Sequence, residues 1–197
     1  MKKFELTTES IETVSGEKLF RIKALVSFDA VEAGELGGYV EKEENLSHEG
    51  NAWVYDNAQV YGNARVYGNA RVHGNARVHG NAWVYGNAWV YDNARVHGNA
   101  RVHGNAQVCG DADIYDNSQK SSVDGFGSEN RTTTFFREKS GGVGVKCGCF
   151  SGTLDEFREK VRKTHGDSEI AQEYLAIADV EERRFKRVAK KGEETDD

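Results

Sequence analysis

The chain has 197 residues with 22 glycines, no proline, a net charge of −6 and 38% hydrophobic residues, which is low for one compact globular core. No apolar run is long enough for a membrane-spanning helix, and the charged residues after Met1 argue against a secretion signal. We therefore expect a cytoplasmic protein with no membrane contact, whose three cysteines are reduced thiols.

The first segment, residues 1–32, predicts a β-hairpin. Two runs of alternating apolar and polar side chains, residues 4–13 and 20–28, flank the turn sequence Ser15-Gly16-Glu17. The open end of a repeat array exposes unpaired backbone groups and invites polymerisation. We therefore interpret the hairpin as a cap for the repeat that follows.

An internal repeat fills residues 51–110, where ten hexads of the form Asn-Ala-x-Val-(Tyr/His)-(Gly/Asp) follow one another without insertion. An eleventh hexad ends at Asp116, a degenerate copy starts at Asn45, and the register extends upstream towards Ala33. Ala and Val would point inward, and x and Tyr/His outward. Gly or Asp followed by Asn suits a strained corner, and Asn side chains of successive coils would stack into amide ladders.

The repeat predicts a mainly β fold, in which residues 33–122 form a hexapeptide-repeat solenoid. The hexad alone allows two or three strands per coil, that is, 12 or 18 residues. The aliphatic and small interior residues favour the 18-residue triangular coil, and with it a left-handed parallel β-helix. Such a helix is an exception to the usual right-handed crossover between parallel strands.

The last segment, residues 123–197, predicts a C-terminal ββαα cap of the α+β type, or a small separate domain. A polar, glycine-rich stretch before it is typical of a linker, and Thr153-Leu154-Asp155-Glu156 is a capping box that begins a helix. The expected elements are a linker over 117–130, strands over 131–137 and 144–150, a helix from Thr153, a longer helix from Asp167 to about Lys191, and a disordered acidic tail over 193–197.

With an 18-residue period, outward side chains stack in columns on three faces, and all three tryptophans take outward positions. An arginine over a tryptophan ring can form a cation–π pair. Large flat side chains also stabilise a β surface as such, but contiguous exposed aromatic residues mark interfaces, and Trp, Tyr and Arg are enriched at binding hot spots. The candidate binding and interface residues are Trp53, Arg71, Trp89, Tyr55 and Tyr91 on one face, Arg77, Arg95, His79 and His97 on the second, and Arg65, Trp83, Arg101 and Tyr85 on the third.

Other residues could carry chemistry, but a bland role fits each better. Cys147 and Cys149 would share one side of a strand, which favours a buried thiol pair, because zinc needs four ligands. Hexapeptide-repeat acyltransferases use a histidine as general base, often near a loop that interrupts the coils; here the histidines recur at a regular outward position and no loop breaks residues 51–116. His48 replaces an inward valine and is expected to be a satisfied buried polar group. We therefore expect no enzyme, no catalytic residue, no metal and no cofactor.

The chain resembles small hexapeptide-repeat proteins of phages and prophages. The resemblance rests on residues 36–47 (LGGYVEKEENLS), on the NARVYG-type hexads, and on residues 147–157 (CGCFSGTLDEF). It implies an accessory role in a host cytoplasm, such as immune evasion by an inhibitor of host defence of the anti-CRISPR kind or by a sponge for a nucleotide signal. The resemblance brings no catalytic residue with it, and the role is an association only.

Together these features predict a non-enzymatic, homo-oligomeric binding protein, a dimer or trimer joined through a Trp face. It would occlude a host protein or sequester an anionic ligand, either a nucleotide or a nucleic acid. Residues 51–110 carry a net charge of +3 within an acidic chain, which suits an anionic partner. Two alternatives stay open: nucleic-acid binding by the Arg, Trp and Tyr columns, with a strong salt dependence, and acyl transfer.

Overall fold

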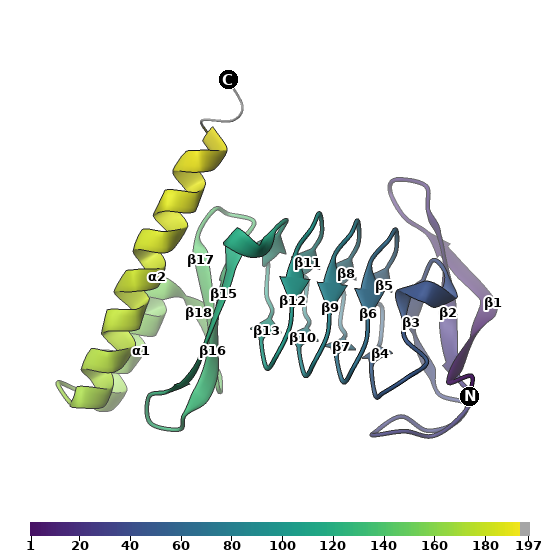
Figure 1. Cartoon of the computed structure of the whole chain (residues 1–197), viewed down its shortest axis with the longest axis horizontal. Helices are drawn as coiled ribbons and strands as arrows, with labels where there is room; N and C mark the ends of the chain where they lie inside the picture. The colour runs from purple at the N-terminus through teal and green to yellow at the C-terminus, as the bar shows by residue number, and fades with distance from the viewer. Residues whose placement is uncertain (194–197) are drawn as a thin grey trace. The chain divides into compact units, whose positions relative to one another are not determined.

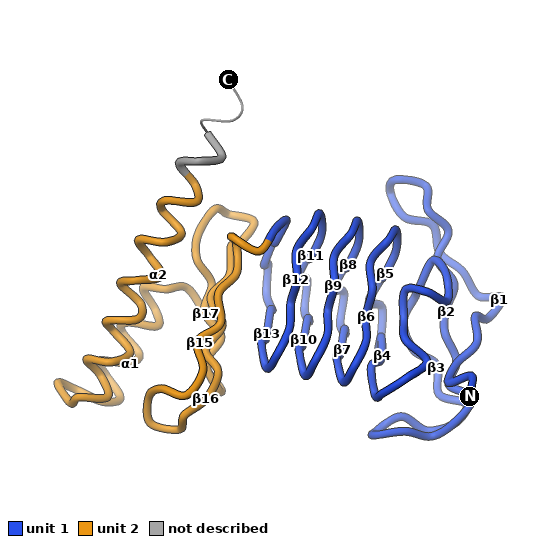
Figure 2. The backbone as a smooth tube through the Cα atoms, viewed as in Figure 1, with its two compact units in different colours: residues 1–116 blue, residues 117–197 orange. Residues whose placement is uncertain are grey.

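The computed structural model describes residues 1–193, with side chains placed up to residue 189. It divides into two compact units, Met1–Asp116 and Asn117–Asp197 (Figure 2). Residues 117–122, expected as the end of the solenoid, belong to the second unit. The expected acidic tail lies outside the described residues, except for Glu193 at the end of the last helix.

The centre of the first unit is a parallel β-solenoid whose coils follow one another as a row of stacked turns (Figure 1). Each strand pairs in parallel with the strand 18 residues later, as Trp53 does with Arg71 and Arg71 with Trp89. The three-strand coil is therefore confirmed, and the 12-residue alternative is wrong. The strands are β4 (Trp53–Val54), β5 (Gln59–Val60), β6 (Arg65–Val66), β7 (Arg71–Val72), β8 (Arg77–Val78), β9 (Trp83–Val84), β10 (Trp89–Val90), β11 (Arg95–Val96), β12 (Arg101–Val102), β13 (Gln107–Val108) and β14 (Asp113–Ile114).

The inward positions form the core predicted from the hexad. Each inward Ala and Val from Ala52 to Val108 is at most 1% exposed. The corners take the left-handed conformation, with φ of 68° at Gly62 and 51° at Asp56. A Cβ atom at Gly62 would lie 3.2 Å from the backbone nitrogen of Gly80 in the next coil, so glycine serves both the dihedral angle and the close stacking.

The predicted asparagine ladders are present along the corners. The Asn63 amide donates to Asn81 (3.2 Å) and the Asn81 amide donates to Asn99 (3.2 Å). A second ladder runs through Asn69, Asn87 and Asn105, with distances of 3.0 and 3.1 Å. These side chains tie one coil to the next outside the backbone ladder.

The N-terminal strands continue one sheet of the solenoid. β1 (Phe4–Glu12) and β2 (Lys18–Ala24) form the expected antiparallel hairpin, and β2 pairs with β3 (Leu36–Val40), which runs parallel to β5. Tyr39 lies opposite Gln59, 20 residues later, so the first coil is two residues longer than the others. The expectation that the strict register extends upstream towards Ala33 is therefore wrong. The short 3-10 helix η1 (Glu43–Asn45) lies within this longer coil.

Two side chains complete the hydrogen bonds of the first coil. Backbone amides of one coil donate to carbonyls of the next, so the first coil has carbonyl oxygens without a preceding coil. The Lys3 ammonium donates to the carbonyls of Gly50 (3.2 Å) and Ala52 (2.8 Å). The Asn45 amide donates to those of Gly62 (3.2 Å) and Ala64 (2.9 Å). Lys3 is only 3% exposed, and burial lowers its pKa to about 8.

The second unit is a four-stranded antiparallel sheet followed by two helices. The sheet has the order β15 (Lys120–Phe126), β16 (Arg131–Arg137), β17 (Val143–Cys147) and β18 (Phe150–Thr153), and the helices are α1 (Leu154–His165) and α2 (Glu169–Glu193). The expected linker is instead the 3-10 helix η2 (Asn117–Gln119) and β15, whose partner β16 draws it into the sheet. The capping box at Thr153 begins α1 as predicted. Phe135, Phe157, Tyr174 and Phe185 form much of the core.

Within the described residues, no helix is both long and apolar enough to cross a membrane.

Candidate functional site

The outward columns of the solenoid occupy three faces that differ in how far other residues cover them. The first face consists of β4, β7, β10 and β13, and the second of β5, β8, β11 and β14. The third face consists of β6, β9 and β12. Because a side chain can bind a partner only where it is accessible, the cover on each face decides which columns qualify.

The N-terminal residues cover one end of the first face. Trp53 is 0% exposed, and its ring packs edge-on against Phe4 and Phe28 at centroid distances of 6.2 and 5.4 Å. Arg71 forms an ion pair with Asp29 at 2.5 Å. Trp53 is outward, as predicted, but as an exposed interface residue it is a wrong prediction, because residues before the repeat bury it.

The rest of the first face keeps partial exposure. The Trp89 ring lies 5.1 Å from the Arg71 guanidinium, which confirms the expected cation–π pairing of neighbouring coils. Tyr55 and Tyr91 are half-buried beside this column. Burial, together with a hydrogen bond to Cys109, raises the pKa of Tyr91.

The second face presents a stack of rings beside a column of arginines. Tyr61, His79 and His97 lie nearly parallel, with centroid distances of 4.8 and 5.1 Å between neighbours. Burial lowers the pKa of His79 to about 4, and the positive charges of nearby side chains add to this effect. The ring nitrogen Nε2 of His97 lies 2.7 Å from Asp113. The histidines here are thus part of an ordered surface stack.

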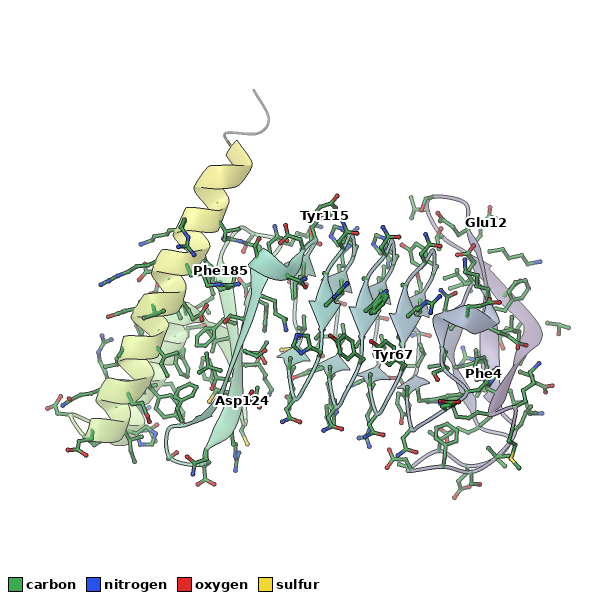
Figure 3. The ribbon with its side chains drawn as sticks, viewed as in Figure 1. Phe4, Glu12, Tyr67, Tyr115, Asp124 and Phe185 are labelled. Atoms are coloured by element: carbon green, nitrogen blue, oxygen red, sulfur yellow. The ribbon has the colours of Figure 1, made fainter. Side chains whose placement is uncertain are left out.

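The third face is the most open of the three, and we call it the Trp83 face; it comprises Arg65, Trp83, Arg101, Tyr67, Tyr85 and His103. Arg65 and Arg101 are exposed, and the Arg101 guanidinium lies 5.0 Å from the ring of Trp83. Beside this column the rings of Tyr67, Tyr85 and His103 stack at 4.9 and 5.2 Å (Figure 3). Flat rings and guanidinium groups therefore alternate on one accessible surface.

A groove of about 580 Å³ lies at the N-terminal end of the Trp83 face, within the size range of small-molecule sites. Arg65, Tyr67 and Trp83 form one side of the groove, and residues of the degenerate hexad with the 3-10 helix form the other. Arg65 has no ion-pair or hydrogen-bond partner among the described residues. The lining residues are Glu43, Glu44, Leu46, Ser47, His48, Arg65, Val66, Tyr67 and Trp83.

His48 belongs to this groove and was not among the predicted site residues. Its Nδ1 accepts a hydrogen bond from the Lys3 backbone amide (3.2 Å), and its ring stacks on Phe4 at 4.4 Å. Its side chain is 30% exposed, so the expectation of a satisfied polar group is met but that of burial is wrong. Hydrogen bonds from Lys2 and His48 lower the pKa of Glu43. Tyr67 could have been found from the sequence, because it occupies the same repeat position as Tyr85.

The cysteine motif does not form the expected buried pair. Cys147 ends β17, Gly148 makes the turn with φ of 55°, and Cys149 is exposed. The two thiols therefore do not share one side of a strand. Nor does the described part of the chain bring three or more His, Cys, Asp or Glu side chains together as a metal site would.

The structure thus places the predicted residues on separate faces and brings only some of them together. Arg65, Trp83, Arg101 and Tyr85 form one surface, whereas Arg77, Arg95, His79 and His97 lie on another. Sequence comparison finds the family model of the YdcK β-solenoid repeat over residues 58–74, 70–86 and 88–104, while no curated protein matches the chain. The chain is a repeat β-solenoid protein, similar over these coils to the YdcK repeat.

Proposed function

We propose that this protein is a non-catalytic binding protein, and that its Trp83 face binds an anionic ligand that carries an aromatic ring, of the nucleotide class. The observation that carries this proposal is the arginine–tryptophan–arginine column of Arg65, Trp83 and Arg101 beside a ring stack, on the most open face, next to a groove of about 580 Å³.

Each half of such a ligand has a counterpart on this face. A base that stacks on a tryptophan or tyrosine ring gains about 1–3 kcal/mol. A guanidinium group binds phosphate through two parallel hydrogen bonds. Arg65 lines the groove together with Tyr67 and Trp83, so one ligand can reach a ring and a guanidinium at once.

A binding role without catalysis is supported by the regularity of the coils. The repeat runs through residues 51–110 without an inserted loop that could cover a substrate. The histidines near this surface stack with tyrosines, as His103 does with Tyr85, and occupy a structural repeat position. Sequestration of a nucleotide signal, as in a counter-defence protein, is one use that such a site would serve.

Calorimetry with a panel of purine and pyrimidine nucleotides tests this proposal. We expect micromolar binding by the intact chain, at least about tenfold weaker in Arg65→Gln, which corresponds to roughly 1.4 kcal/mol. Arg77→Gln is the matched control, because Arg77 is also an exposed arginine of the solenoid but lies on the second face. No nucleotide binding at all, or an equal loss in both variants, would show the proposal to be wrong.

A second candidate is single-stranded nucleic acid bound along the same face. It is favoured by the spacing of the column, in which Arg65, Trp83 and Arg101 follow one another coil by coil at about 4.8 Å. An oligonucleotide would then bind more tightly than a mononucleotide, with affinity that falls steeply as salt rises. Salt-independent binding, or oligonucleotides no tighter than mononucleotides, would exclude this mode.

A further inference from the structure

A second groove, of about 450 Å³, lies on the second face of the solenoid beneath the end of the β1–β2 hairpin. The hairpin contributes Thr13, Ser15 and Glu17, and the solenoid contributes Arg77, His79 and Arg95. This hairpin groove belongs to a different face from the Trp83 face and shares no lining residue with its groove. It is therefore a separate candidate site.

Two arginines lie directly opposite each other in the groove. Arg77 and Arg95 are register partners in the parallel strands β8 and β11. Like charges at such positions repel and destabilise a sheet. In the described part of the chain neither arginine has an ion-pair or hydrogen-bond partner, and Nε of Arg95 is buried without one. By contrast, Arg71 on the first face pairs with Asp29.

His79 adds a third polar group without a partner. Its Nε2 is buried and makes no hydrogen bond. Its ring is held between Tyr61 and His97, so it has little freedom to turn away from the groove. Its pKa of about 4 means that the ring is neutral at pH 7, and a neutral imidazole carries an N–H donor at Nε2 in one of its two tautomers.

The carboxylates around the groove are held by other groups. The Glu17 carboxylate accepts hydrogen bonds from the hydroxyls of Thr13 and Ser15, which lower its pKa. Asp113, the register partner of Arg95 in β14, lies 2.7 Å from His97. Glu12 is exposed at the end of the hairpin (Figure 3). The two guanidinium charges therefore stay uncompensated by an ion pair.

We propose that the hairpin groove binds a phosphate group between Arg77 and Arg95, with His79 as an additional donor. A phosphate at pH 7 carries close to two negative charges, which match the two arginines, and its tetrahedral oxygens accept the forked hydrogen bonds that guanidinium groups donate. A single carboxylate would neutralise only one of the two. The phosphate is either inorganic phosphate or the terminal group of a phosphate monoester.

Titration of the full chain with inorganic phosphate, at constant ionic strength, tests this site. We expect saturable binding with a dissociation constant below about 1 mM. Arg77→Gln and Arg95→Gln should each weaken it at least tenfold, whereas Arg65→Gln on the Trp83 face should leave it unchanged. No saturation up to about 10 mM, or equal weakening by Arg65→Gln, overturns the proposal.

A second readout separates a binding role of these residues from a structural one. Phosphate between the arginines would offset the positive charges near His79, so its pKa, followed by NMR of the imidazole, should rise in the presence of phosphate. Arg77→Lys and Arg95→Lys keep the charge but lose the fork, and should retain folding with weaker phosphate binding. An unchanged His79 titration with saturating phosphate contradicts the site. Tighter binding of phenyl phosphate than of inorganic phosphate would identify a monoester, and equal or weaker binding would identify the free ion.

Discussion

The guanidinium of Arg101 lies 5.0 Å from the ring of Trp83 in the preceding coil, on a face that the N-terminal segment leaves open. Trp53 occupies an equivalent outward position of the repeat but is buried by Phe4 and Phe28. Two tryptophans with the same repeat environment therefore have different roles. Trp53 anchors the N-terminal segment, and Trp83 is available to a partner.

Removal of the Lys3 side chain should destabilise the first coil. In Lys3→Ala the carbonyls of Gly50 and Ala52 lose their buried donor, at a cost of about 1–3 kcal/mol for each group left unsatisfied. Urea unfolding followed by circular dichroism measures the loss. Lys2→Ala is the control, because Lys2 makes an exposed ion pair with Glu43 worth at most about 1 kcal/mol. Equal destabilisation in the two variants would contradict the role of Lys3.

The corner glycines should differ in their tolerance of alanine. Gly86 has φ of 71°, and a Cβ atom there would lie 3.0 Å from the backbone nitrogen of Gly104 in the next coil. Gly104 has φ of 66°, and its Cβ would meet nothing within 4 Å. Both changes cost about 1–2 kcal/mol for the left-handed backbone, and Gly86→Ala adds a steric term. Thermal unfolding of both variants should therefore show a lower melting temperature for Gly86→Ala; the reverse order would refute this account of the corners.

Acid should destabilise the solenoid in part through His79. Its pKa falls from 6.5 in the unfolded chain to about 4 in the fold, so the unfolded chain binds more protons between these values. The stability that His79 contributes is complete above pH 6.5 and is lost as pH falls towards 4. His79→Tyr keeps a stacking ring at a position where the repeat also uses tyrosine, and removes this titration.

Melting temperatures of the parent chain and His79→Tyr at pH 7, 5 and 4 measure the effect. The gap between pH 7 and pH 4 should be smaller in the variant. An identical pH dependence would mean that other groups, such as His73, whose pKa is also lowered by burial, account for the acid sensitivity.

Self-association through a tryptophan face remains a prediction, and burial of Trp53 narrows it to Trp89 or Trp83. We expect Trp89 to be the contact if the Trp83 face holds a ligand. Light scattering at tens of micromolar should then give the mass of a dimer or trimer for the parent chain and for Trp83→Ala, and a lower mass for Trp89→Ala. A monomeric parent chain would end the oligomer hypothesis.

Much of the solenoid could be predicted from the hexad, because its information is local. Alternation of Ala and Val with outward residues, and corners such as Asp56 and Gly62, specify strand, turn and interior within six residues. Where the pattern decays, prediction was weaker. The strand β15 was missed because residues such as Lys120 and Ser122 gain strand structure only by pairing with Phe136 and Thr134 of β16.

The sequence by itself determined the coil, its interior and the order of its outward columns, because a period of six residues leaves one way to bury alanine and valine together. Only the tertiary structure decided which columns a partner can reach. That choice depends on contacts between residues far apart in the chain, such as Asp29 with Arg71 and Phe28 with Trp53, and no local pattern encodes them. The hairpin groove has the same origin, since it forms where the end of the β1–β2 hairpin meets Arg77 and His79.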